Sequence, residues 1–333
     1  MQRISEEILS KCRSLLEDGT ADRVLAWESG EFCYDVTPAV FTKETLDNMI
    51  YDDFCAANQS KYCIAESKKD GKIVALLKPC DTYSFNQLLK EHRIRRENVF
   101  VLGVPCSGKV DPQAARALGI KGITAAKIEG DQVVFETLYG EKTCAKKDVL
   151  FEKCKACKGK KHMIYDALSN EADAPDEAVP NQDFGSRFAY IENLEHLSAE
   201  ERFAFWRNEL SRCIRCNACR NVCPACTCET CVFDNHDLGT DNKAPASDFE
   251  ENFFHIIRAF HVTSRCTDCG ECSRVCPQHI PLHLLNRKLI RDTNELYGAY
   301  QAGADLETKP PLMDYRTDDC EPSVVYERGG AKG

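Results

Sequence analysis

Two runs of cysteines carry the residues of this sequence that are best suited to redox chemistry. Each run has the spacing C-x2-C-x2-C-x3-C-P. The last cysteine of the first run is Cys223, and the second run begins at Cys266, after 42 intervening residues. This spacing is typical of chains that bind two 4Fe–4S clusters, in which three closely spaced thiolates bind one cluster and the fourth cysteine binds the other. The predicted ligands are therefore Cys213, Cys216, Cys219 and Cys276 for cluster one, and Cys266, Cys269, Cys272 and Cys223 for cluster two.

Zinc and disulfides are the simpler interpretations of these cysteines. Structural zinc sites favour two separated CxxC pairs over two runs of this kind. Disulfides need an oxidising compartment, and residues 1–7 lack the apolar core of a signal peptide. The spacing therefore favours iron–sulfur clusters over both alternatives.

Four further cysteines in the first half of the chain are candidates for a third cluster. Cys80 and Cys106 each follow an expected buried strand, at 72–77 and 99–104. Parallel strands present their carboxyl ends at one edge of a sheet, which would bring these two thiols together. Cys154 and Cys157 form a later CxxC that can fold back on that edge. We expect a 4Fe–4S cluster here, with a zinc site or unrelated buried thiols as the alternatives.

The elements around these cysteines predict an α+β fold followed by a mostly helical part. We expect helices at 3–18 and 42–58, strands within 23–41, and a hairpin from 124–127 to 132–138 that turns at Gly130-Asp131. Asp81 is expected to cap the helix after the first buried strand, and Asp111 a short helix after the second. Lys158, Lys160 and Lys161 around His162 are expected to form a solvated basic patch.

The second half of the chain reads as helices that frame each cysteine run. Ser198 and Glu201 form a capping box, and Phe203, Trp206 and Leu210 make the expected inner face of that helix. Apolar residues within 253–260 and after Pro281 predict two more helices. The predicted organisation is a 1–168 α/β domain with one cluster, a 169–195 acidic linker, a 196–302 helical dicluster domain and a 303–333 extended tail. The extra thiols Cys226, Cys228 and Cys231 are either packed small residues, which we favour, or metal ligands completed by His236 or Cys320.

Length, charge and hydropathy exclude several classes of protein. The chain has 333 residues, 21 cysteines and a formal net charge of −10. The negative charge argues against general nucleic-acid binding, and no apolar run approaches the roughly 20 residues of a membrane span. So many cysteines without a secretory signal indicate a cytoplasmic protein, and thiol-ligated clusters suggest an anaerobe.

Residues 60–165 resemble the β subunit family of deazaflavin-reducing hydrogenases and formate dehydrogenases. The resemblance rests on Pro79-Cys80, Pro105-Cys106 and the Cys154–Cys157 motif, and it implies that these four cysteines bind a 4Fe–4S cluster. Residues 198–300 are similar to the helical dicluster ferredoxin module of heterodisulfide-reductase-type subunits. Together these similarities imply an electron-transfer subunit that works between a catalytic subunit and a flavin subunit. No catalytic side chain is needed for that role.

The resemblance leaves flavin binding as the main alternative. Family members that bind flavin and deazaflavin carry a Ser-Gly-Gly segment before the first helix, and residues 41–55 contain no glycine. We therefore expect no FAD, although a flavin- or deazaflavin-binding oxidoreductase subunit remains the alternative function.

Overall fold

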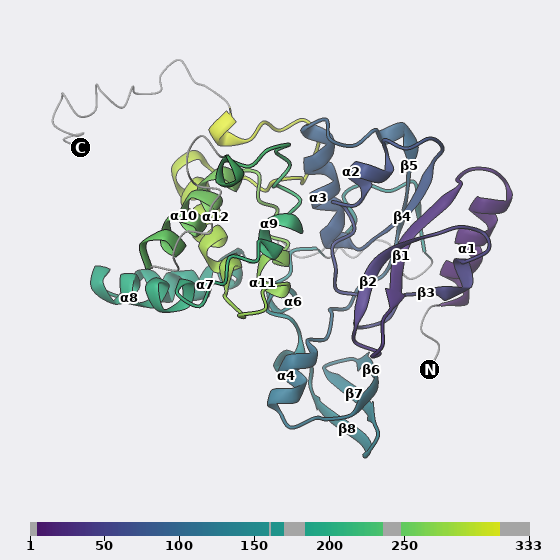
Figure 1. The fold of residues 1–333 in the computed structure, drawn as a ribbon, viewed down its shortest axis with the longest axis horizontal. Helices are drawn as coiled ribbons and strands as arrows, with labels where there is room; N and C mark the ends of the chain where they lie inside the picture. Colours follow the sequence, from purple (N-terminus) through teal and green to yellow (C-terminus); the bar gives the residue numbers. More distant parts are fainter. Residues whose placement is uncertain (1–4, 160, 170–183, 236–247, 314–333) are drawn as a thin grey trace.

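A six-stranded sheet forms the framework of the N-terminal half of the chain (Figure 1). The computed structural model describes residues 5–159, 161–169, 184–235 and 248–313. The strand order is β2-β1-β4-β5-β9, with β3 also paired to β1. Strands β1, β4, β5 and β9 are parallel, whereas β2 and β3 run antiparallel to β1. The bounds are β1 (Arg23–Ser29), β2 (Val36–Phe41), β3 (Met49–Ile50), β4 (Ile73–Leu77), β5 (Val99–Gly103) and β9 (Ala167–Leu168).

Helices cover both faces of this sheet because the central strands are apolar on both sides. Helix α1 (Glu6–Glu17) packs against Val74 and Leu76 of β4 on one face. Helix α3 (Pro79–Lys90) packs against the alternate β4 residues, Ile73 and Ala75, on the other. The predicted helix at 3–18 and the two predicted parallel strands are thus confirmed.

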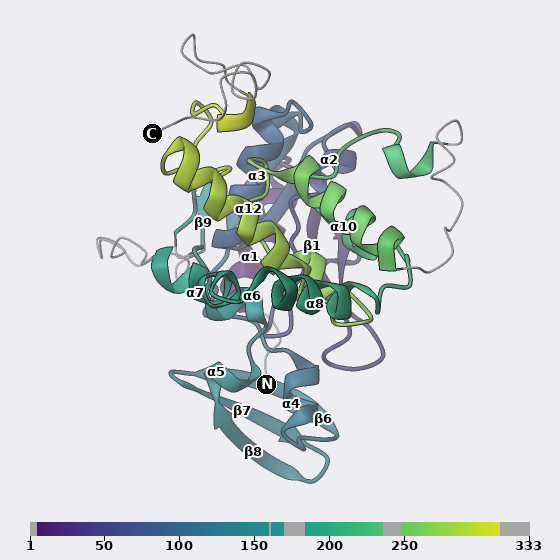
Figure 2. The ribbon, with the colours of Figure 1, turned by 90° about the vertical axis from the view of Figure 1, so that its left-hand side faces the viewer.

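The predicted hairpin forms one half of a small lobe that projects from the rest of the chain (Figures 1 and 2). Strands β6 (Ile123–Glu129) and β7 (Gln132–Thr137) pair antiparallel across Gly130-Asp131, as expected. A third strand, β8 (Gly140–Ala145), was not predicted; its residues are largely exposed and give no apolar alternation. Helices α4 (Pro112–Ala117) and α5 (Lys146–Val149) complete the lobe. Asp111 caps α4 by accepting a hydrogen bond from the Gln113 amide.

The C-terminal half is helical, as predicted, so the expected α+β fold followed by a mostly helical part is confirmed. Its helices are α7 (Phe184–Glu195), α8 (Ala199–Leu210), α9 (Ala218–Asn221), α10 (Asp248–Val262), α11 (Glu271–Arg274) and α12 (Leu282–Tyr297). The first half contributes two further short helices, α2 (Cys63–Glu66) and α6 (Glu152–Lys155). Within the described ranges, no helix combines the length and apolarity that a bilayer crossing requires.

Several local predictions are wrong for identifiable reasons. Residues 42–58 do not form a helix. Met49 and Ile50 instead form the short strand β3, which pairs with β1. A turn follows, in which the Asp52 carboxylate accepts a hydrogen bond from the Phe54 amide. Asp81 does cap α3, but from the third helical position and not as the N-cap residue, which is Lys78; its carboxylate accepts a hydrogen bond from the Lys78 amide. In the predicted linker at 169–195, residues 184–195 form helix α7. Residues 170–183 of this predicted linker lie outside the described ranges.

Helix α8 packs through two of the three residues predicted for its inner face. Its capping box between Ser198 and Glu201 is present. Leu210 is buried, and Trp206 packs against Ile191 of α7, so these two predictions are confirmed. Phe203 is 62 % exposed, and Phe205 takes part in the contact with α7 in its place.

After α12 the chain returns to the N-terminal sheet domain. The Asn86 side chain of α3 donates to the Gly303 carbonyl (3.1 Å), and Lys90 donates to the Thr308 carbonyl. The first part of the predicted tail therefore lies along this protein itself. Residues 314–333 are outside the described ranges.

Gly303→Ala should detach this returning segment from α3. A Cβ at Gly303 would lie 1.8 Å from the Tyr83 carbonyl oxygen, and the residue has φ +73°. Gly119→Ala is the matched control, since its φ is +79° and nothing lies within 4 Å of the added Cβ. Both changes carry a backbone penalty of about 1 kcal/mol, so a loss of stability larger by about 1–3 kcal/mol in Gly303→Ala measures the clash. Equal denaturation midpoints for the two variants would contradict this packing.

Candidate iron–sulfur centres

The two cysteine runs fold into the same local conformation. In each run, the second residue after the first cysteine and the residue after the second cysteine have positive φ. These residues are Arg215 (54°), Asn217 (61°), Asp268 (52°) and Gly270 (66°). Positive φ is uncommon outside glycine, so its recurrence at matching positions indicates a shared requirement of the loop. The short helices α9 and α11 then begin at corresponding places.

This conformation turns backbone amides toward the cysteine sulfurs. The Arg215 amide donates to Cys213 Sγ (3.3 Å), and the Asp268 amide donates to Cys266 Sγ (3.4 Å). Such bonds favour the thiolate, which is the form that binds a metal. The loops are therefore suited to metal binding rather than to packing alone.

The structure brings together the four thiols predicted for cluster one. A single cavity is lined by Cys213, Cys216 and Cys219 of the first run and by Cys276 of the second. The last cysteine of the second run has thus crossed to the first, as the spacing predicted. Helix α10 closes this cavity with Phe254 and His255.

The four thiols predicted for cluster two are also neighbours. Burial raises the pKa of Cys266, Cys269 and Cys272, and the nearby Cys223 thiol contributes to the rise in each case. Arg258 lies between the two sites, where it donates to the Cys219 carbonyl (2.9 Å). Burial alone would lower its pKa, but the surrounding thiols raise it.

The N-terminal set of four also converges at one edge of the sheet. Cys80 lies in the first turn of α3, directly after β4, and Cys106 follows β5. A hydrogen bond from Cys80 lowers the pKa of Cys157 to about 6. Burial raises the pKa of Cys154 to about 11, with Cys106 and Cys157 as further causes. The topological argument from the strand ends therefore placed these thiols correctly.

Each of the three predicted donor sets consists of four cysteines. The twelve predicted ligands are free thiols rather than disulfides. Four thiolates are the ligands that 4Fe–4S clusters take, whereas structural zinc sites also accept four cysteines. The donor sets therefore fit an iron–sulfur cluster, and the spacing of the two runs is what favours it over zinc.

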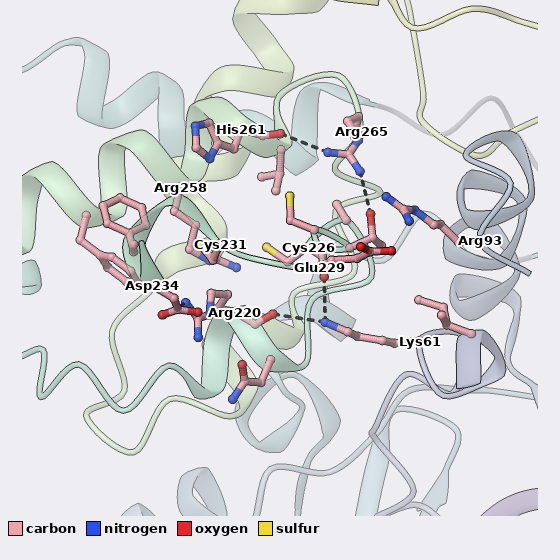
Figure 3. A pocket seen from close by; sticks show the side chains of 18 of the residues that line it. Lys61, Arg93, Arg220, Cys226, Glu229, Cys231, Asp234, Arg258, His261 and Arg265 are labelled. Atoms are coloured by element: carbon pink, nitrogen blue, oxygen red, sulfur yellow. Dashed lines mark hydrogen bonds and ion pairs between the residues drawn. The ribbon is translucent and has the colours of Figure 1, made fainter. Parts of the chain in front are cut away.

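The three extra cysteines line a separate cavity between the two halves of the chain. Cys226, Cys228 and Cys231 border a space of about 560 Å³. Figure 3 shows Lys61 reaching this cavity from the N-terminal half, where it donates to the backbone carbonyls of Arg220 (3.4 Å) and Cys226 (3.0 Å). His236 and Cys320, the residues proposed to complete a metal site with these three cysteines, are not within the described ranges. Cys226 packs against the cluster of Cys223, Ala225 and Val262, as the packing interpretation expects, whereas Cys228 is exposed and does not fit it.

Cys226 nevertheless contacts a predicted ligand. A hydrogen bond from Cys226 lowers the pKa of Cys223 to about 5. The motif and the nearness of Cys223 to the three thiols of the second run both favour Cys223 as the ligand.

The predicted basic patch near the third site is wrong for the two residues nearest the thiols. Lys158 is 5 % exposed and donates to the Thr267 carbonyl of the second run. His162 is 3 % exposed, and its Nε2 lies 3.0 Å from the Leu77 carbonyl oxygen. Lys161 is exposed, and Lys160 is outside the described ranges. These side chains fasten the site to β4 and to the cluster-two loop, a role that a lysine-rich sequence does not reveal.

Gly159 is a residue of the third site that the sequence analysis missed. Its amide donates to Cys157 Sγ (3.3 Å). An added Cβ would lie 2.5 Å from the Cys80 backbone nitrogen. The one available indication in the sequence was a glycine two residues after the CxxC, which is weak by itself.

Gly159→Ala should therefore separate Cys157 from Cys80 and abolish iron binding at this site. We expect about four fewer irons per chain in anaerobically purified protein, with the other two sites intact. Gly130→Ala in the hairpin turn is a suitable control, since nothing lies within 4 Å of its added Cβ. Full iron content in Gly159→Ala would show that the close approach is not required.

Comparison with known proteins agrees with this arrangement. Residues 209–280 match the family model described as a 4Fe-4S dicluster domain. The chain is 26 % identical to the F420-dependent formate dehydrogenase subunit beta of Methanocaldococcus jannaschii, over 90 % of this chain and 92 % of that protein. It is 25 % identical to the F420-dependent formate dehydrogenase 1 subunit beta of Methanococcus maripaludis, over 90 % of each.

A solved structure shows partial similarity. The F420-reducing NiFe hydrogenase complex from Methanosarcina barkeri contains a chain that matches with a TM-score of 0.40 and 16 % identity. The match covers 52 % of this chain and 63 % of that one. The predicted resemblance to β subunits of this kind is thus confirmed by the sequence relatives, and the dicluster prediction by the family model.

Proposed function

We propose that this chain is the electron-transfer subunit of an anaerobic multisubunit oxidoreductase, which relays single electrons through three 4Fe–4S clusters. One observation carries this proposal: Cys276 of the second run lines the same cavity as Cys213, Cys216 and Cys219 of the first run. Four thiols from two distant runs around one cavity, with matched loop conformations in both runs, are what a dicluster module requires. The second site would use Cys266, Cys269, Cys272 and Cys223, and the third Cys80, Cys106, Cys154 and Cys157.

The partners follow from the relatives. Both are named as subunits of F420-dependent formate dehydrogenases, so a formate-oxidising catalytic subunit is the proposed electron donor. A hydrogenase or similar catalytic subunit could take the same position. A flavin or heterodisulfide-reductase-like subunit is the proposed acceptor.

The protein's own part in this function is to bind the clusters and tune their potentials. When bound, a 4Fe–4S cluster supplies one-electron redox chemistry. The chain supplies the thiolates and the hydrogen bonds from backbone amides to their sulfurs. Arg258, between the first two sites, adds a fixed positive charge beside both sets of thiolates. No acid, base or nucleophile is needed for this function.

Iron and acid-labile sulfide in anaerobically purified protein test the proposal. We expect about twelve of each per chain. About eight irons per chain would contradict the third cluster, and about four would contradict the dicluster arrangement. Zinc in stoichiometric amount at the two runs, in protein never exposed to air, would also contradict it.

A second candidate function is favoured by the names of the relatives, which include F420 dependence. In that case the chain itself would bind a flavin or deazaflavin and act as an oxidoreductase subunit. Family members that bind flavin carry glycines in the region that matches residues 41–55. Here that region contains β3 and the turns beside it, and it has no glycine. Flavin released by acid from the purified chain would support this alternative, whereas its absence would leave the relay function.

A further inference from the structure

A buried histidine in α10 faces the proposed cluster-one site. His255 is 2 % exposed and lines the same cavity as Cys213, Cys216, Cys219 and Cys276. Within the described ranges, neither of its ring nitrogens has a hydrogen-bond partner. Leaving a buried polar group unsatisfied costs about 1–3 kcal/mol, and such groups are rare in folded proteins. The imidazole therefore has hydrogen-bonding capacity that the described part of the chain leaves unused.

The position of His255 limits what this partner can be. A ring nitrogen of His255, an oxygen of Glu251 and the sulfur of Cys213 all lie within 4.8 Å of one another. Glu251 is one turn earlier on α10 and already hydrogen-bonds Cys213. The cavity lining also includes the cationic Arg215 and the amides Asn217 and Gln278, beside the apolar Phe254, Ile280 and Leu282. Two acceptors are then open to the imidazole: the unpaired oxygen of Glu251 and the group that the four thiols bind. A nitrogen coupling to the cluster distinguishes the second from the first.

We propose that His255 donates a hydrogen bond from its imidazole N–H to a sulfur of cluster one and thereby raises the reduction potential of that cluster. This inference rests on the proposed function, because it needs a cluster in the cavity. Added electron density in the reduced cluster lies partly on sulfur, so an N–H donor stabilises the reduced form more than the oxidised form. His255 is a positioning residue here and not a cluster ligand.

The second cluster site carries a different donor. The Asn286 side chain, on α12, points its amide at Cys272 Sγ (3.7 Å). Among the buried polar side chains near the sulfurs, the first site has an imidazole and the second a carboxamide. The two otherwise similar sites therefore differ in a neutral hydrogen-bond donor.

The test is an EPR-monitored redox titration of anaerobically purified protein. His255→Leu removes the donor, His255→Gln keeps an N–H, and His261→Leu changes an exposed histidine at the end of the same helix. Cys216→Ser identifies the cluster-one signal, because it alters or removes that signal alone. We expect His255→Leu to make cluster one about tenfold harder to reduce, about 59 mV for a one-electron couple. His255→Gln should recover most of this change, and His261→Leu should have none.

Wild-type protein labelled with ¹⁵N-histidine provides a measurement that does not depend on a variant folding. Pulsed EPR of reduced cluster one should show a nitrogen coupling, and His255→Gln should remove it. Full iron content with no nitrogen coupling, or with unchanged potentials in His255→Leu, would overturn this inference and leave the relay function intact. Wild-type protein without clusters would instead overturn the proposed function.

Discussion

Cys223→Ala should remove about four irons per chain, while Cys226→Ala should leave the iron content unchanged. The two thiols are adjacent and hydrogen-bonded to each other, so removing either one leaves a thiol in the same loop. The difference is expected from the spacing and from the neighbours of Cys223. Cys223 is the fourth cysteine of its run and precedes Pro224, and it lies beside the three thiols of the other run.

This pair of variants is a strict test because each is the control for the other. Both remove one sulfur from the same loop, and the remaining thiol is available to replace the missing ligand. Iron content and the EPR spectrum of the reduced protein provide the measurement. If Cys226→Ala loses the iron and Cys223→Ala keeps it, the ligand assignment for cluster two is wrong. If both keep it, the two thiols substitute for each other.

Glu271→Gln should destabilise the protein by about 3–5 kcal/mol. Glu271 is 0 % exposed and lies between two cations, Lys153 of α6 and Arg274 of α11. Arg274 contacts both carboxylate oxygens, at 2.8–3.1 Å. These cations hold the pKa of Glu271 well below its usual range, although burial would raise it. Neutralising this carboxylate leaves two charges buried without their partner, which is the costly case for a buried ion pair.

Glu152→Gln is the matched control for this prediction. Its partner is Lys155, and both side chains are substantially exposed. An exposed pair contributes no more than about 1 kcal/mol. Guanidinium unfolding under anaerobic conditions, followed by circular dichroism, compares the two variants. If Glu271→Gln loses no more unfolding free energy than Glu152→Gln, the packing of the two halves of the chain against each other does not depend on the contacts of Glu271.

The sequence was sufficient where one strong pattern determined the local structure. The two cysteine runs predicted a crosswise arrangement, which the cavity with Cys276 reproduces. The βα units predicted that Cys80 and Cys106 would meet, since both follow neighbouring parallel strands. In each case a backbone rule converts sequence spacing into spatial proximity.

The errors arose where tertiary contacts select among local options. Leu46, Met49 and Ile50 have helical spacing, yet pairing with β1 makes two of them a strand. Lys158 and His162 are polar residues in a lysine-rich segment, yet they are buried because they bond backbone carbonyls of distant elements. Apolar periodicity carries no information about such partners, and neither does charge.

The contact between Lys153 and Glu271 also has a kinetic consequence. Lys153 immediately precedes Cys154 of the third site, and Glu271 immediately precedes Cys272 of the second. Ser84 and Thr267 add a hydrogen bond (2.8 Å) across the same junction. If electrons pass between these two sites, they cross a gap whose width is fixed by the folded chain. Their transfer should then be insensitive to solvent viscosity, unlike transfer that waits for a hinged domain to swing into place.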